Sequence, residues 1–295
     1  MQTLLVPIDF TAASEDALLY ANKLAVRLTA EIVLVQAGLG PALTPARRPA
    51  LLHRLEALAE RLRYQQLTRQ SGRCIRYHYH LAAEALPAAL EVLVAGYRAD
   101  LVVTGQALIN CAAPGGAGQQ LPERVSCPVL VVPLGRHELA ARVVVAGDFA
   151  GLNGHPLAGL PALARARDVR FDFVQFYPPT TAGLAPLKKA LRAACAQIPA
   201  ARAHLLPEAD ALEGLGEFCD QQGAQLLVLA TTDGCVTRRF FHPHYTQTRA
   251  YHLRIPVLLL PASVRPTEIS CAACSLRKAA VRQGASASPA SLQRS

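Results

Sequence analysis

The sequence predicts an α/β protein with two tandem doubly wound domains, each a five-stranded parallel sheet, followed by a disordered C-terminal tail. Three observations lead to this prediction. Short apolar runs alternate with segments of helical periodicity, as in a parallel sheet covered on both faces. Four sequence blocks recur in the same order in the second half. The final segment is rich in Ser, Ala, Arg, Gln and Pro, and has too few large apolar residues to offset the entropy cost of ordering.

In the first half, the predicted strands are the apolar runs at residues 3–8, 31–36, 74–81, 101–104 and 129–132. The predicted helices are the segments with helical spacing at residues 17–28, 50–70 and 86–97, with a short helix between the last two strands. Thr11 or Ser14 caps the first helix, and Glu15 and Asp16 complement its dipole.

The second half repeats this order. Its predicted strands are at residues 143–145, 170–176, 203–206, 226–229 and 257–260, and its predicted helices are at residues 157–166, 187–196 and 212–222. The recurring blocks are 6–10 with 145–149, 34–36 with 173–175, 99–105 with 224–230, and 128–133 with 256–261. We therefore expect a domain at residues 1–136, a divergent second domain at 140–262 and the tail at 263–295.

Composition excludes several other classes of protein. The chain has 295 residues, of which 52% are hydrophobic and 17% charged, so it is neither wholly disordered nor a disulfide scaffold. No apolar run approaches the about 20 residues of a membrane span, and the first residues lack a basic leader. The eight cysteines are widely spaced, which favours reduced thiols. We expect a cytoplasmic protein without a membrane partner.

The basic charge does not predict a nucleic-acid partner. The formal net charge is +9, but the tail beyond residue 263 contributes +4 of it, which leaves +5 for the folded part. Aromatic residues make up only 5% of the chain, whereas a nucleic-acid surface needs clustered cations with aromatics between them. A basic tail that contacts nucleic acid remains a third, weaker hypothesis.

The repeated blocks resemble the universal stress protein family in its tandem two-domain form. The likeness rests on residues 6–18, 99–105 and 127–133, and in the second half on residues 147–149, 226–232 and 250–261. The resemblance implies Rossmann-like domains and stress-linked regulation in the cytoplasm. It also implies pairing along the last strands, here residues 128–132 and 256–260, between the two domains or in a homodimer. The resemblance does not identify a protein partner.

Family members that bind ATP have a Gly-x2-Gly-x9-Gly-Ser/Thr pattern after the fourth strand, where backbone N–H groups approach the phosphates. In the first domain Gly105 matches the first glycine, but Leu108 occupies the second glycine position. Gly115, Gly116 and Gly118 follow without the Ser/Thr. This glycine segment either forms an anion-binding nest or is a plain flexible loop. ATP is therefore an alternative ligand in the first domain only, and no cofactor is expected.

The second domain departs further from the ATP-binding pattern. The corresponding positions are occupied by Ala230, Asp233, Pro243 and His244. Proline lacks an N–H donor and a carboxylate repels phosphate, so we expect no nucleotide here unless Arg238 and Arg239 hold an anion differently.

An aspartate follows the first strand of each domain. Asp9 and Asp148 match the aspartate that contacts adenosine in ATP-binding members. Either carboxylate can instead cap the helix that follows it, so both interpretations stay open.

Histidine and cysteine clusters do not predict a metal site. His242, His244 and His252 lack a recognisable third-ligand spacing and fit a solvated loop. His78 and His80 fit the polar face of an edge strand. Cys271 and Cys274 form a lone Cys-x-x-Cys pair in the tail, which chance spacing or a redox-sensitive thiol explains.

The sequence shows no catalytic constellation, so the leading hypothesis is a non-enzymatic stress protein. It acts through protein pairing, and its nucleotide sites are degraded. The alternative is an ATP-binding sensor that keeps one site in the first domain, with slow hydrolysis as its strongest form.

Overall fold

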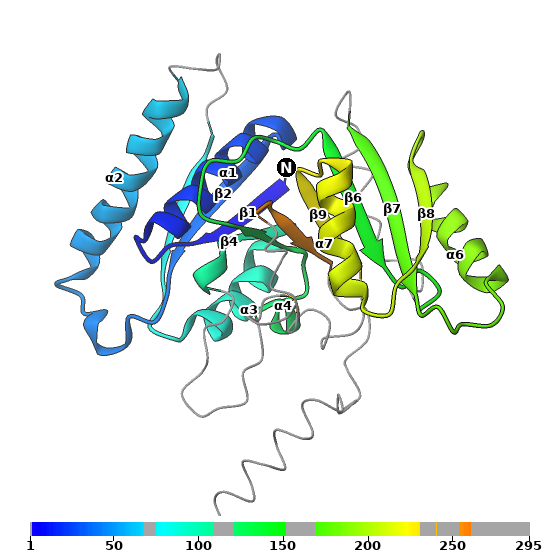
Figure 1. The fold of residues 1–295 in the computed structure, drawn as a ribbon. Coiled ribbons are helices and arrows are strands. Elements are labelled where there is room, and N and C mark those ends of the chain that lie inside the picture. Colours follow the sequence, from blue (N-terminus) through cyan, green and yellow to red (C-terminus); the bar gives the residue numbers. More distant parts are fainter. Residues whose placement is uncertain are drawn as a thin grey trace, which may run out of the picture. The chain divides into compact units, whose positions relative to one another are not determined.

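The computed structural model describes residues 2–67, 75–108, 121–151, 169–230, 240 and 254–260, all within the compact unit Met1–Ser263. These residues form a ten-stranded sheet with the order β3-β2-β1-β4-β5-β10-β9-β6-β7-β8 (Figure 1). Every neighbouring pair is parallel except β5 and β10, which are antiparallel. The predicted α/β fold with a mostly parallel sheet is confirmed.

The strands agree closely with the predicted apolar runs. They are β1 (Gln2–Pro7), β2 (Ala30–Gln36), β3 (Tyr77–Leu81), β4 (Leu101–Gly105), β5 (Val129–Val132), β6 (Arg142–Gly147), β7 (Arg170–Tyr177), β8 (Arg202–Pro207), β9 (Leu226–Ala230) and β10 (Val257–Leu259). Except in the edge strands β3 and β8, the central residues of the strands are buried, because helices cover both faces of the sheet.

The helices also follow the predicted order. They are α1 (Ala12–Leu28), α2 (Arg48–Leu67), α3 (Leu86–Tyr97), α4 (Leu121–Arg124), α6 (Ala185–Cys195) and α7 (Ala211–Gln222), with the 3₁₀ turns η1 (Gly40–Ala42) and η2 (Gln106–Leu108). The predicted helix at 157–166 and the predicted tail at 263–295 lie outside the described residues. None of the helices described combines the length and hydrophobicity needed to cross a membrane.

Two hydrophobic layers cover the sheet. Side chains of α1, α2 and α6 pack in one layer, and side chains of α3, α4 and α7 pack in the other. Both layers continue across the junction of β5 and β10. Leu130 and Leu258 are directly opposite each other in the first layer, and Val131 and Val257 are opposite each other in the second. The junction is therefore part of the core on both faces.

The chain between β5 and β6 is bound to the surface of α1. The Gly135 N–H donates to Asp16 Oδ2 at 2.7 Å. Lys23 Nζ donates to the His137 carbonyl at 2.7 Å and to Glu138 Oε1 at 2.8 Å. These contacts fix the path of the connection between the two sets of five strands.

Candidate functional site

The candidate site of the first half lies where β1 and β4 end. These two strands are parallel neighbours, with Leu4 opposite Leu101 and Leu5 opposite Val102. Asp9 follows β1 and Gly105 ends β4, so both residues lie at the same edge of the sheet. Ligands of open parallel sheets bind at the carboxyl ends of the strands, which makes this edge the position to test.

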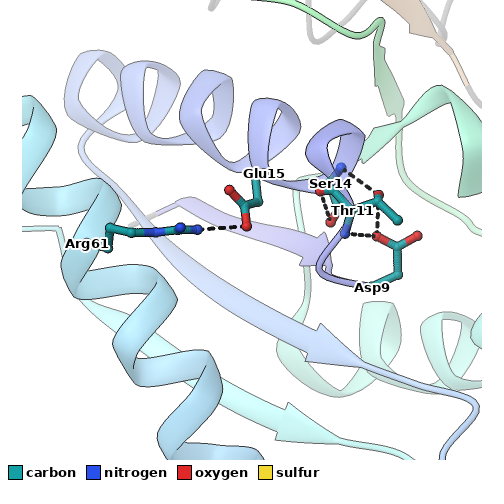
Figure 2. A network of polar contacts seen from close by, with 5 residues as sticks. All are labelled: Asp9, Thr11, Ser14, Glu15 and Arg61. Atoms are coloured by element: carbon teal, nitrogen blue, oxygen red, sulfur yellow. Dashed lines mark hydrogen bonds and ion pairs between the residues drawn. The ribbon is translucent and has the colours of Figure 1, made fainter.

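Asp9 is part of the hydrogen-bond network that starts α1 (Figure 2). Its Oδ1 accepts from the Thr11 N–H at 3.0 Å and from the Thr11 hydroxyl at 2.6 Å. The Thr11 hydroxyl oxygen in turn accepts from the Ser14 N–H at 3.4 Å, and the Ser14 hydroxyl donates to the Thr11 carbonyl at 3.0 Å. Thr11 is thus the N-cap of α1, one of the two predicted caps. Asp9 orients the cap but is not the cap itself.

The network favours the ionised form of Asp9. Partial burial acts to raise the pKa of this carboxyl, but hydrogen bonds from Thr11 and Ser14 outweigh it and hold the pKa below its usual value of 3.8. Asp9 is exposed and negatively charged at neutral pH. Such a group suits a hydroxyl donor, as in a ribose, better than a phosphate.

Contacts from α2 hold the loop between β1 and α1 and the first turn of α1. Phe10 has a φ of 61°, in the left-handed region. The Arg54 guanidinium lies 3.8 Å from the centre of the Phe10 ring, which is a cation–π contact. Arg61 Nη2 forms an ion pair with Glu15 Oε1 at 2.7 Å (Figure 2). The sequence analysis missed Arg54 and Arg61 because no local pattern relates α2 to this loop.

Gly105 permits close packing of β4 against α1. A Cβ atom at this position would lie 2.8 Å from the Ala13 carbonyl oxygen, closer than real Cβ contacts allow. A glycine is therefore required here for packing alone, whether or not a ligand binds.

The second half places different partners around its aspartate. Asp148 Oδ1 accepts from the Ala150 N–H at 3.2 Å and from Gln175 Nε2 at 3.0 Å. Gln175 is only 4% exposed and belongs to β7. Asp148 thus contacts a neighbouring strand, whereas Asp9 contacts its own helix cap. The repeated block at residues 173–175 contained Gln175, but its spacing gave no sign of this contact.

The glycine at the strand ends lies on a different strand in each half, on β4 in the first and on β6 in the second. In the second half Gly147 ends β6, and a Cβ atom added to it would clash with the backbone of Ala230, its partner on β9. Ala230 stands where the first half has Gly105. The second half therefore lacks the first glycine of the ATP-binding pattern, and the glycine of this strand pair is Gly147 on β6.

The other predicted site residues are not described by the structure. Gly115, Gly116 and Gly118 of the first half lie outside the described residues, as do Asp233, Pro243 and His244 of the second. The same holds for the remaining flagged positions, His242, His252, Arg238, Arg239, Cys271 and Cys274. Of the nucleotide-binding candidates, the structure brings together only Asp9 and Gly105, and separately Asp148 and Ala230.

The described histidines of β3 have structural partners, and β3 is an edge strand as predicted. His78 Nε2 lies 3.4 Å from Glu31 Oε2. The His80 ring packs edge-on against Tyr97 with centroids 6.4 Å apart. Burial and the nearby Arg48 lower the pKa of His80. Within the described parts of the chain, no group of His, Cys, Asp or Glu is arranged to hold a metal ion.

Comparisons with known proteins address the first half directly. Residues 1–133 match the model of the universal stress protein family. A search of curated proteins found no match to the sequence. The universal stress protein expectation is thus supported by sequence in the first half.

Solved structures extend the likeness to the fold of most of the chain. A universal stress protein from Archaeoglobus fulgidus is similar with a TM-score of 0.54 and 12% identity, over 88% of this chain and 96% of that one. A functionally unknown protein from Pseudomonas aeruginosa PAO1 has a TM-score of 0.54 and 15% identity, over 89% of this chain and 93% of that one. A putative universal stress protein from Pseudomonas aeruginosa UCBPP-PA14 has a TM-score of 0.54 and 15% identity, over 88% of this chain and 93% of that one. At these identities the likeness is one of fold.

Replacing Thr11 tests the network at Asp9. In Thr11→Ala we expect a loss of about 1 kcal/mol in the free energy of unfolding, because the cap is removed. We also expect the Asp9 pKa to rise toward 3.8, measured by carboxyl NMR titration. Because the folded pKa is below the unfolded one, the stabilisation from Asp9 is present above the unfolded value and is lost as pH falls through the folded value. Thr11→Ser keeps the hydroxyl and should preserve both properties; an unchanged Asp9 pKa in Thr11→Ala contradicts the account.

Replacing Gly105 tests whether packing alone requires a glycine. Gly105→Ala places its Cβ against Ala13 and should lower the free energy of unfolding by about 1–3 kcal/mol in urea denaturation. Gly96→Ala is the matched control, because Gly96 lies in α3 with nothing within 4 Å of the added Cβ. That variant should gain about 0.5–1 kcal/mol from helix propensity. Equal effects in the two variants would show that Gly105 is not required for packing.

Proposed function

We propose that this protein is a non-enzymatic stress-response protein of the universal stress protein type, in which two tandem domains are paired through their last strands. It acts as a scaffold for another protein rather than as a nucleotide-dependent enzyme. The proposal places it in the cytoplasm and includes pairing within the chain, with a homodimer as the larger assembly. The observation that carries it is the antiparallel pairing of β5 with β10.

The junction of β5 and β10 supports a permanent pairing. Val129, Leu130 and Val131 are opposite Leu259, Leu258 and Val257, and all six are at most 6% exposed. Burying such side chains removes each from water with a gain of about 1.5–3 kcal/mol, so separation of these strands would be costly. A scaffold needs such a permanent junction, because a partner that contacts both halves requires them in one fixed arrangement.

The described site residues support a degraded nucleotide site. Gly105 is required for packing against Ala13, and Asp9 is engaged in the cap network of α1. Both residues thus have a structural role that needs no ligand. In addition, Leu108 and Ala230 occupy glycine positions of the ATP-binding pattern. Side chains at these positions keep a phosphate away from the backbone N–H groups.

A second candidate function is an ATP-binding sensor with one site in the first half. It is favoured by the exposed, ionised Asp9 at the carboxyl end of β1, beside the start of α1. This carboxylate has an oxygen, Oδ2, besides the Oδ1 that accepts from Thr11. An adenosine hydroxyl could donate to it. Among the described residues, Asp148 likewise accepts from Ala150 and Gln175 at Oδ1 alone, so the second half differs mainly in having Ala230 where the first half has Gly105.

Calorimetric titration of the full chain with ATP and ADP in the presence of Mg²⁺ distinguishes the two functions. The scaffold proposal predicts no saturable heat up to about 1 mM nucleotide, which corresponds to binding weaker than about 4 kcal/mol. Saturable binding near one equivalent would overturn it in favour of the sensor. Asp9→Ala should then abolish the heat, and the matched variant Asp148→Ala should retain it.

A further inference from the structure

Charge is divided between the two faces of the sheet. On the face covered by α1, α2 and α6, α1 has two acidic and two basic residues, α2 has four arginines against two glutamates, and α6 has three basic residues and no acidic one. On the opposite face, α3 has one glutamate, α4 has one residue of each sign, and α7 has three acidic residues and no basic one. The sequence average of +9 conceals this division.

The basic charge of α6 is exposed and uncompensated. Lys188, Lys189 and Arg192 are exposed, and Arg192 lies four residues after Lys188 and three after Lys189, so it neighbours both on the helix surface. Within the described parts of the chain, none of them forms an ion pair. In α2, Arg61 pairs with Glu15 at 2.7 Å and Arg63 with Glu60 at 3.1 Å, whereas Arg48 and Arg54 form no ion pair among the described residues. Helix α6 differs from α2 in that all three of its charges are basic and none is paired with another described residue.

The acidic charge of α7 forms a stripe along the helix. Glu213, Glu217 and Asp220 are spaced four and three residues apart and lie on one side of the helix. Glu217 and Asp220 are exposed, and Glu213 is half-buried. Arg142 starts β6, and its guanidinium lies beside Gly223, the C-cap of α7.

Helices α6 and α7 pack on opposite faces of the same end of the sheet, α6 on β7 and β8 and α7 on β6 and β7 (Figure 1). Each copy of the chain thus offers a basic helix on one face and an acidic helix of similar length on the other. We propose that copies of this chain associate face to face, with α6 of one copy against α7 of the next. Such a contact joins two different surfaces, so it can add further copies beyond a pair.

The chemistry of these surfaces predicts a weak, salt-sensitive contact. The exposed large hydrophobic side chains among the described residues are Tyr64, Val92 and Leu134, none of which belongs to α6 or α7. The contact therefore depends on charge complementarity, which gives modest affinity between exposed groups and is screened by salt. A second copy fits better than a polyanion, because three cations on one short helix offer few phosphate contacts, whereas α7 of a second copy exposes the carboxylates of Glu217 and Asp220.

Sedimentation velocity of the full chain over a concentration series tests the proposal. We expect association at about 20 mM salt and its loss at about 500 mM salt, where the screening length is only a few ångströms. Lys188→Glu/Lys189→Glu and Glu217→Lys/Asp220→Lys should each weaken association at least about tenfold. An equimolar mixture of these two variants should associate again, because each supplies the charge that the other lacks. That recovery also shows that both variants are folded.

The control is Arg47→Glu/Arg48→Glu, which makes the same charge change on exposed residues at the start of α2. It should associate like the unmodified chain. The proposal is overturned if the unmodified chain is monomeric at low salt, if the control weakens association equally, or if the mixture fails to associate. Binding of duplex DNA through Lys188 and Lys189 without self-association would also overturn it and assign α6 to a polyanion.

Discussion

The antiparallel pairing of β5 with β10 is the interaction on which the rest of the sheet depends. Both strands are short and wholly apolar, and without each other they would expose hydrophobic edges prone to aggregation. Pairing satisfies their backbone groups and extends both hydrophobic layers through Leu130, Leu258, Val131 and Val257. The edges that remain are β3 and β8, which carry histidine and arginine. The polar strands β3 and β8 are thus the edges exposed to solvent, because the apolar strands β5 and β10 pair with each other.

The same arrangement determines what the strand ends can do. Parallel order within each set of five strands brings Asp9 near Gly105 and Asp148 near Ala230. In the first half both residues are used to hold α1 in place, through the Thr11 cap and the close approach of Ala13. The helix also holds the connection to the second half through Asp16 and Lys23. The residues that resemble a nucleotide site therefore help to hold α1, which in turn holds the connection between β5 and β6.

Much of this framework could be predicted from the sequence, because it rests on local patterns. Apolar runs located every described strand, and Thr11 was one of two predicted caps. Contacts between distant segments left no such pattern. Examples are Arg54 on Phe10, Gln175 on Asp148, and the η1 turn, which is held by hydrogen bonds from residues 38–40 to the carbonyls of residues 82–84. The division of charge between the two faces of the sheet could not be predicted for the same reason, since no local pattern says on which face a helix packs.

A double-mutant cycle at Leu130 and Leu258 tests the junction of β5 and β10 most directly. The account predicts a single unfolding transition in urea and a coupling energy of about 0.5–1 kcal/mol between Leu130→Ala and Leu258→Ala, because these side chains lie opposite each other. A control cycle of Leu130→Ala with Leu191→Ala should be additive, because α6 packs on β7 and β8, at least four strands from β5. Additive effects of Leu130→Ala and Leu258→Ala, or separate transitions for the two halves, would contradict the pairing on which this account rests.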